Sequence, residues 1–158
     1  MVNNGEIRSF RGEYNFLSNF YPCTVVHDGK VYPSLEAAFQ AAKCNDLRER
    51  DRFQRLEPAA AKKIGKQVAI RSDWEAVKLS ILKELVRIKF ISEPHLLSLL
   101  LSTGDAYLSE DNMWHDNFYG NCTCARCRDI TGLNYLGHTL MSLRDQISFF
   151  ISKHGGVQ

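Results

Sequence analysis

Residues 24–43 read TVVHDGKVYPSLEAAFQAAK, and this stretch decides the fold class. β-Branched and aromatic residues on both sides of Asp28-Gly29 predict two short strands joined by a two-residue hairpin turn, because glycine tolerates a positive φ. Pro33-Ser34 then begins a helix that runs to about Lys43 or Asn45, with Ser34 as its N-cap. A strand pair that leads directly into a helix indicates the α+β class.

The rest of the chain is mostly helical. Alanines favour a helix from about Pro58 to Gly65. Apolar residues spaced by three and four predict longer helices from about Asp73 to Phe90 and from about Leu136 to Ser152. Another spans about Pro94 to Ser102 and ends before Gly104. The apolar faces of the two long helices comprise Trp74, Val77, Ile81, Leu85 and Ile88 in the first and Leu136, Leu140, Leu143, Ile147 and Ile151 in the second.

Length and composition fit a single helix-rich domain with a small hairpin. The chain has 158 residues, 44% of them hydrophobic and 24% charged, and no repeat or linker divides it. We therefore expect one compact domain over residues 1–158, with its core at about 10–150. The N-terminus lacks the pattern of a signal peptide, and the apolar cluster Leu96–Leu101 is too short to span a bilayer. A cytoplasmic location is the expectation.

The helix after the hairpin carries a mixed polar and aromatic face. Glu36, Phe39, Gln40 and Lys43 fall at positions i, i+3, i+4 and i+7, so they share one side. A carboxylate and an amine two turns apart, with a ring and an amide between them, make a pocket wall. The alternative is an amphipathic surface helix whose polar residues are solvated.

Residues elsewhere offer further binding groups, each with a plainer alternative. Asn19 carries a donor and an acceptor for a base edge or a ribose hydroxyl, and Phe20 offers a stacking ring. The alternative is that this segment forms a turn and that its aromatic rings pack in the hydrophobic core. Trp74 is core unless its ring lies at a rim. Arg11 pairs with phosphate or is simply solvated.

Residues 105–133 show little periodicity and are rich in Asn, Asp, Gly, Cys and aromatic residues. Long irregular segments inside compact domains are usually functional or disordered, and the aromatic clusters favour an ordered site loop. Within it, Asp116 lies among rings, and a carboxylate in such surroundings suits acid, base or electrostatic work.

The five cysteines are an odd number, so a disulfide framework would leave one over. Three of them have the spacing Cys122-x-Cys124-x-x-Cys127. A tetrahedral zinc site would need a fourth ligand. The candidates for this fourth ligand are Cys23, Cys44, His115 and His138, but none of them stands at a spacing that is diagnostic of a zinc site. Free thiols in a reducing compartment are the preferred interpretation, and no metal or cofactor is expected.

The combined motifs resemble the NADAR family of YbiA-like N-glycosidases. The resemblance runs from about Phe10 to Ile147 and keeps the motif order. It rests on NFLSNF (15–20), YPSLEAAFQAAK (32–43), WEAVK (74–78), KF (89–90), LLLST (99–103), Leu108, Asp116, YG (119–120), GLNYLGHTLM (132–141) and Arg144.

The resemblance implies a compact, helix-rich α+β domain that hydrolyses N-glycosidic bonds without a cofactor. Family members act on phosphoribosylamino-pyrimidines of riboflavin synthesis or on ADP-ribose attached to guanine. By motif, the catalytic positions fall on Glu36, Lys43 and Asp116. The resemblance also places Trp74 at a functional position, with Asn19 and Phe20 as pocket contacts. The further substrate contacts that we expect are Arg11, Phe39, Gln40, Trp114, Tyr119, Gly120 and Asn134. The family commonly has Trp-Gly where this chain has Tyr119-Gly120, and that smaller ring leaves the exact substrate open.

A mechanism follows as a hypothesis. Departure of the base builds positive charge on the sugar, which carboxylates such as Glu36 and Asp116 stabilise. Lys43, if uncharged, can attack the sugar carbon and form a Schiff base; otherwise it holds phosphate as a cation. The net charge of +2 favours small-molecule substrates over ADP-ribosylated nucleic acid. The alternatives are a non-catalytic module that binds ADP-ribose or a nucleotide and, behind it, a zinc-stabilised interaction module.

Overall fold

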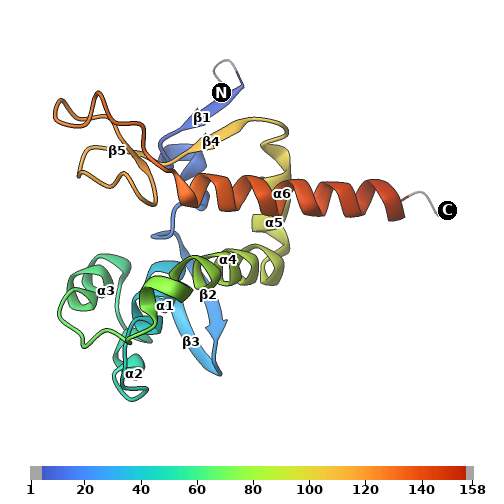
Figure 1. Ribbon diagram of the computed structural model, residues 1–158. Helices are drawn as coiled ribbons and strands as arrows, with labels where there is room; N and C mark the ends of the chain where they lie inside the picture. Colours follow the sequence, from blue (N-terminus) through green and yellow to red (C-terminus); the bar gives the residue numbers. More distant parts are fainter. Residues whose placement is uncertain (1–4, 156–158) are drawn as a thin grey trace. The chain divides into compact units, whose positions relative to one another are not determined.

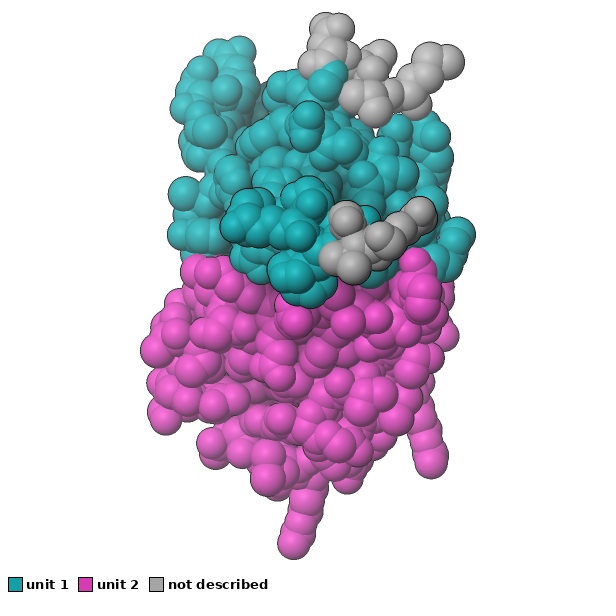
Figure 2. Space-filling model, turned by 90° about the vertical axis from the view of Figure 1, so that its right-hand side faces the viewer, with its two compact units in different colours: residues 1–18, 95–158 teal, residues 19–94 magenta. Residues whose placement is uncertain are grey.

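The computed structural model describes residues 5–155, so the ends of the expected 1–158 domain (residues 1–4 and 156–158) lie outside the described residues. The chain divides into two compact units, one of residues 1–18 with 95–158 and one of residues 19–94 (Figure 2). We call them unit 1 and unit 2. Five helices follow one another in the middle of the chain, and the strands before and after them form small two-stranded sheets, so the predicted helix-rich α+β class is confirmed.

Unit 2 begins with the predicted hairpin. Strands β2 (Pro22–His27) and β3 (Lys30–Ser34) pair antiparallel, and His27 lies opposite Lys30 across the turn. Asp28 and Gly29 both have positive φ, 49° and 73°, as a tight hairpin turn of this kind requires. The hairpin prediction is therefore confirmed, and Figure 1 shows β3 leading into the first helix.

Four helices follow the hairpin in unit 2: α1 (Leu35–Ala42), α2 (Arg50–Phe53), α3 (Pro58–Gly65) and α4 (Trp74–Ser92). The Ser34 hydroxyl caps α1 by accepting a hydrogen bond from the Ala37 amide at 3.1 Å, as predicted. Only α2 has no counterpart in the sequence prediction, because one helical turn carries too few residues to show a period.

The buried face of α4 is broader than its sequence pattern predicts. Val77 and Ile88 are only half-buried, whereas Leu82, Val86 and Lys89 are buried beside the expected residues. The helix thus buries two adjacent rows of side chains, where the sequence suggested one.

Unit 1 contains β1 (Glu6–Arg8), the 3₁₀ helix η1 (Gly12–Leu17), α5 (Pro94–Ser102), β4 (Tyr107–Ser109), β5 (Asp111–Asn112), β6 (Asn121–Cys122) and α6 (Tyr135–His154). Strand β1 pairs with β4, and β5 with β6, in both cases parallel. The expected irregular loop 105–133 therefore contains three strands. They are two or three residues long, too short to show alternation.

The prediction that Ile151 belongs to the packed face of α6 is wrong. Leu136, Leu140 and Leu143 are buried as predicted, but Ile151 is 49% exposed and its neighbours Phe149 and Phe150 are exposed as well. The helix has 20 residues, and its last buried one is Arg144. At about 1.5 Å per residue, the end of the helix extends beyond the part that packs.

Candidate active site

The polar face of α1 forms a hydrogen-bonded relay inside unit 2. The Gln40 Nε2 donates to Glu36 Oε1 at 2.8 Å, and Lys43 Nζ donates to Gln40 Oε1 at 3.0 Å. The predicted shared face is confirmed. Glu36 and Gln40 are only 6% and 7% exposed, so the alternative of a solvated surface helix is wrong for these two residues.

The close approach of α3 explains why this polar face is buried. A Cβ placed on Gly65 would lie 1.9 Å from Gln40 Oε1, so only glycine leaves room for the amide. The Gly65 carbonyl oxygen also accepts a hydrogen bond from Lys43 Nζ at 3.0 Å. Sequence reasoning missed Gly65, because its importance depends on which helix packs against α1.

The pKa of Lys43 is lower than that of an ordinary lysine. Burial lowers the pKa of Lys43, with a smaller lowering from Lys66, while the charge of Glu36 acts in the opposite direction. A neutral amine has two N–H donors and one lone pair. The two bonds to Gln40 and Gly65 use both donors and leave the lone pair available.

Aromatic side chains adjoin the relay. The rings of Phe39 and Trp74 lie 5.1 Å apart, tilted by 60°, and both residues are almost fully buried. Trp74 is thus part of a packed aromatic pair. Phe20 is 38% exposed, and Lys62 Nζ lies 5.7 Å from its ring centroid. Of the predicted stacking groups in unit 2, Phe20 presents the most surface, and Lys62 was not predicted.

Asn19 links this aromatic segment to α1 through its backbone. Its carbonyl oxygen accepts a hydrogen bond from the Glu36 amide at 3.0 Å. Its side-chain oxygen, Oδ1, is buried and has no hydrogen-bond partner among the described residues. Buried polar atoms without partners are rare in folded proteins, so this acceptor is suited to a donor on a ligand.

Asp116 has a structural role within unit 1. Its Oδ1 accepts hydrogen bonds from the backbone amides of Phe118 at 3.0 Å and Tyr119 at 2.9 Å, and the residue is half-buried. This pattern holds a tight turn. The predicted catalytic role of Asp116 stays a prediction.

The other predicted contacts of unit 1 occupy varied settings. Gly120 is buried, and a Cβ there would lie 2.4 Å from the Glu110 carbonyl oxygen, so close packing requires this glycine. Asn134 is buried with a φ of 49°; its amide donates to the Leu108 carbonyl oxygen at 2.8 Å and accepts from the Glu110 amide at 3.1 Å. Both ends of that amide are thus engaged within the chain. The remaining three are Arg11 and Trp114, which are exposed, and Tyr119, which is half-buried.

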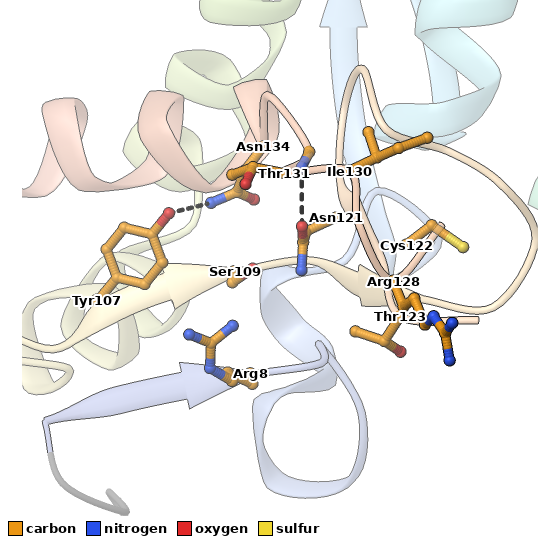
Figure 3. A pocket seen from close by; sticks show the side chains of 11 residues that line it. Arg8, Tyr107, Ser109, Asn121, Cys122, Thr123, Arg128, Ile130, Thr131 and Asn134 are labelled. Atoms are coloured by element: carbon orange, nitrogen blue, oxygen red, sulfur yellow. Dashed lines mark hydrogen bonds between the residues drawn. The ribbon is translucent and has the colours of Figure 1, made fainter. Parts of the chain in front are cut away.

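Unit 1 also holds a cavity of about 460 Å³ (Figure 3). In the figure Tyr107 lies at one end, and Thr123 and Arg128 lie at the other. Asn134 donates to the Tyr107 hydroxyl at 3.3 Å, and Gly132 donates through its amide to Asn121 Oδ1 at 2.9 Å. Of the predicted contacts, only Asn134 lines this cavity.

Four potential metal ligands meet near this cavity. The sulfurs of Cys122, Cys124 and Cys127 and a ring nitrogen of His115 all lie within 4.8 Å of one another. His115 was one of four candidate partners for the cysteines in the sequence, and the fold selects it.

Comparison with known proteins now assigns the family. The NADAR domain profile matches residues 8–148, and this range includes residues of both units. The chain belongs to the NADAR domain family. The resemblance read from the motifs is thereby confirmed.

Relatives of known name support the same assignment. The chain is similar to the N-glycosidase YbiA of Escherichia coli, at 34% identity over 86% of this chain and 83% of that protein. The NMR structure of YbiA matches with a TM-score of 0.78 at 32% identity, covering 94% of this chain and 88% of YbiA. A riboflavin biosynthesis protein of Vibrio vulnificus is 33% identical over 85% of this chain. The chain spans only 36% of that longer protein.

No helix among residues 5–155 combines the length and the apolar character that a membrane crossing demands.

Proposed function

We propose that this NADAR-family chain is an N-glycosidase that hydrolyses the bond between a ribose and a nitrogenous base. The observation that carries the proposal is the buried relay Glu36–Gln40–Lys43 of unit 2. The similarity to proteins named N-glycosidases supports the reaction class. Because the family match includes residues of both units, we also propose that the chain is one NADAR domain.

The carboxylate of Glu36 has the setting that glycosidic bond cleavage requires. As the base leaves, positive charge develops at the sugar carbon, and a carboxylate in a site from which water is excluded stabilises that charge strongly. Glu36 is 6% exposed, and its Oε1 is held by Gln40. Gln40 therefore fixes the orientation of the carboxylate.

Lys43 supplies the nucleophile in this mechanism. Its nitrogen bonds to the sugar C1″ as the bond from C1″ to the base breaks, and the base leaves with the electron pair and takes up a proton. Loss of a proton from the new amine and opening of the ring give a Schiff base, which water hydrolyses to release the sugar and restore the lysine. The lowered pKa of Lys43, caused mainly by burial, favours the neutral amine that this step needs.

The substrate is a ribosylated base, and its binding groups come from unit 2. Phe20 provides an exposed ring for stacking, Asn19 Oδ1 an unsatisfied acceptor, and Lys62 a cation near Phe20 for a phosphate. A free metabolite such as a phosphoribosylamino-pyrimidine fits the modest net charge of +2 better than nucleic acid does. The five cysteines, all in described residues, form no disulfide, which fits a reducing, cytoplasmic location.

A chromatographic turnover assay tests the proposal. Purified protein is offered a phosphoribosylamino-pyrimidine and, separately, an oligonucleotide with ADP-ribosylated guanine, and base release and binding are both measured. We expect release of the base from the pyrimidine compound. Release from the oligonucleotide alone would reassign the substrate to nucleic acid. Binding of either compound with no release would support the non-catalytic module instead.

A further inference from the structure

We propose that His115, Cys122, Cys124 and Cys127 bind one structural Zn²⁺ ion, which holds together the segment 113–130 of unit 1. The inference is independent of the proposed glycosidase activity, since all four residues lie outside the relay on α1. It starts from the donor atoms, which lie within 4.8 Å of one another.

Two nitrogen–sulfur distances match the edges of a zinc tetrahedron. Thiolates at about 2.3 Å and an imidazole nitrogen at about 2.0 Å from a tetrahedral zinc ion are separated by about 3.5 Å from nitrogen to sulfur. The His115 Nδ1 lies 3.3 Å from Cys124 Sγ and 3.5 Å from Cys127 Sγ. Three thiolates and one imidazole form a closed site with no position left for a substrate, which is typical of structural zinc.

The burial pattern of the segment also indicates a metal. Cys122, Cys124 and Cys127 are 2%, 8% and 6% exposed and form a buried cluster made of these three residues alone. Three large apolar side chains of the same region are exposed, with Met113 at 63%, Trp114 at 50% and Ile130 at 52%, whereas Phe118 and Tyr119 are half-buried. The segment thus buries its sulfurs more fully than its large hydrophobic side chains, and a metal ion commonly replaces an apolar core in small structures of this kind.

Asparagine side chains hold the backbone at and beside two of the ligands. The Asn112 Oδ1 accepts hydrogen bonds from the amides of Trp114 and Asp116, both at 3.2 Å, on either side of His115. The His115 backbone has a φ of 66°, a conformation that residues with side chains adopt rarely and that is concentrated at functional sites. The Asn117 Oδ1 accepts from the Cys122 amide at 2.8 Å.

The backbone of the cysteine segment completes the arrangement. The Cys127 amide donates to the Cys124 carbonyl oxygen at 2.9 Å, so the Cys124-x-x-Cys127 pair forms a tight turn that brings its two sulfurs to the same side. Cys122, Thr123 and Arg128 also line the cavity of unit 1. A zinc ion at this cluster would therefore fix one wall of that cavity.

Metal analysis of the whole purified chain tests the proposal. After equilibration with zinc under reducing conditions and removal of unbound ions, we expect one zinc per chain, released when a mercurial reagent blocks the thiols. Substitution by cobalt should give the visible absorption of tetrahedral thiolate coordination. A chain with reduced thiols that retains no zinc, or a disulfide between two of the three cysteines, would overturn the proposal.

Variants separate ligand loss from misfolding. Cys124→Ser and His115→Ala should lower zinc affinity by more than about 100-fold, beyond the range typical of changes outside the ligand set. His115→Cys, which supplies a fourth thiolate, should retain zinc. Cys23→Ser is the matched control, because Cys23 is a half-buried thiol outside the cluster. Equal zinc affinity in the wild type, Cys124→Ser and His115→Ala would contradict the assignment. Glu36→Gln should bind zinc normally, so failure of the glycosidase proposal would leave this one standing.

Discussion

The Lys43 Nζ donates a hydrogen bond to the backbone carbonyl oxygen of Gly65 over 3.0 Å, and this bond ties the end of α1 to the end of α3. The same glycine has no Cβ, and that absence leaves room for the Gln40 amide that Lys43 also contacts. Gly65 therefore positions two members of the relay without contributing a side chain.

Gly65→Ala should damage the site more than the fold. The new Cβ would lie 1.9 Å from Gln40 Oε1 and 2.7 Å from its Cδ, so the amide must move away from Glu36 and Lys43. We expect a loss of about 100-fold in kcat/KM from this displacement and a destabilisation of about 1–3 kcal/mol. Steady-state kinetics and thermal unfolding measure the two effects.

A double variant separates the effect on activity from the effect on stability. In Gly65→Ala with Gln40→Ala most of the clash is removed, so stability should recover while activity should not. Full activity in Gly65→Ala alone would show that the relay is not needed for turnover.

Lys43→Arg distinguishes a nucleophile from a phosphate contact. Arginine keeps the positive charge but cannot offer a neutral amine, so the mechanism predicts a loss of more than about 10³-fold in base release. Borohydride treatment of the wild type during turnover should trap the sugar on Lys43, detectable by mass spectrometry of the peptide. Retained turnover with arginine would eliminate the nucleophile and leave Lys43 as a cation that holds phosphate.

The pH dependence follows from the same lysine. Its pKa is lowered, chiefly by burial, so the neutral amine appears at a lower pH than for an ordinary lysine. The rate of sugar transfer to Lys43 should therefore rise with pH and reach its plateau below the pH at which exposed lysines lose their protons. Single-turnover rates across pH give the profile. A rate that falls as the pH rises through this range would contradict a neutral nucleophile.

Asp116 can be assigned by comparing two substitutions. Its Oδ1 accepts from the amides of Phe118 and Tyr119, and Asp116→Asn keeps one acceptor oxygen for both bonds while removing the charge. A turn-holding role predicts that Asp116→Asn retains most activity and stability and that Asp116→Ala loses about 1–2 kcal/mol of stability. A catalytic role predicts that both variants fold and that both lose turnover.

Much of the fold could be predicted from local patterns. The helix α1 begins directly after its N-cap Ser34, and α3 spans Pro58–Gly65, as capping and propensity indicate. The Asp28-Gly29 turn adopts the positive φ that glycine tolerates. These features depend on residues close together in the chain, so the sequence displays them directly.

Features that depend on tertiary approach could not be predicted. Gly65 looks like an ordinary helix end until α3 packs against Gln40. His115 shows no diagnostic spacing to Cys124 until the segment folds back. The shared face of Glu36, Gln40 and Lys43 was predictable from helical periodicity, but its burial was not, since burial depends on a partner helix distant in sequence.

We propose that Glu36 stabilises the positive charge that develops on the sugar as the glycosidic bond breaks. The most direct test of this role is the single-turnover rate of base release by the wild type and by Glu36→Gln, with substrate affinity measured for both. The glutamine keeps an oxygen that can accept the Gln40 hydrogen bond and removes only the charge. We expect affinity to change little and the rate to fall by at least about 100-fold. An unchanged rate at unchanged affinity would contradict the account and place the chemistry elsewhere in the chain.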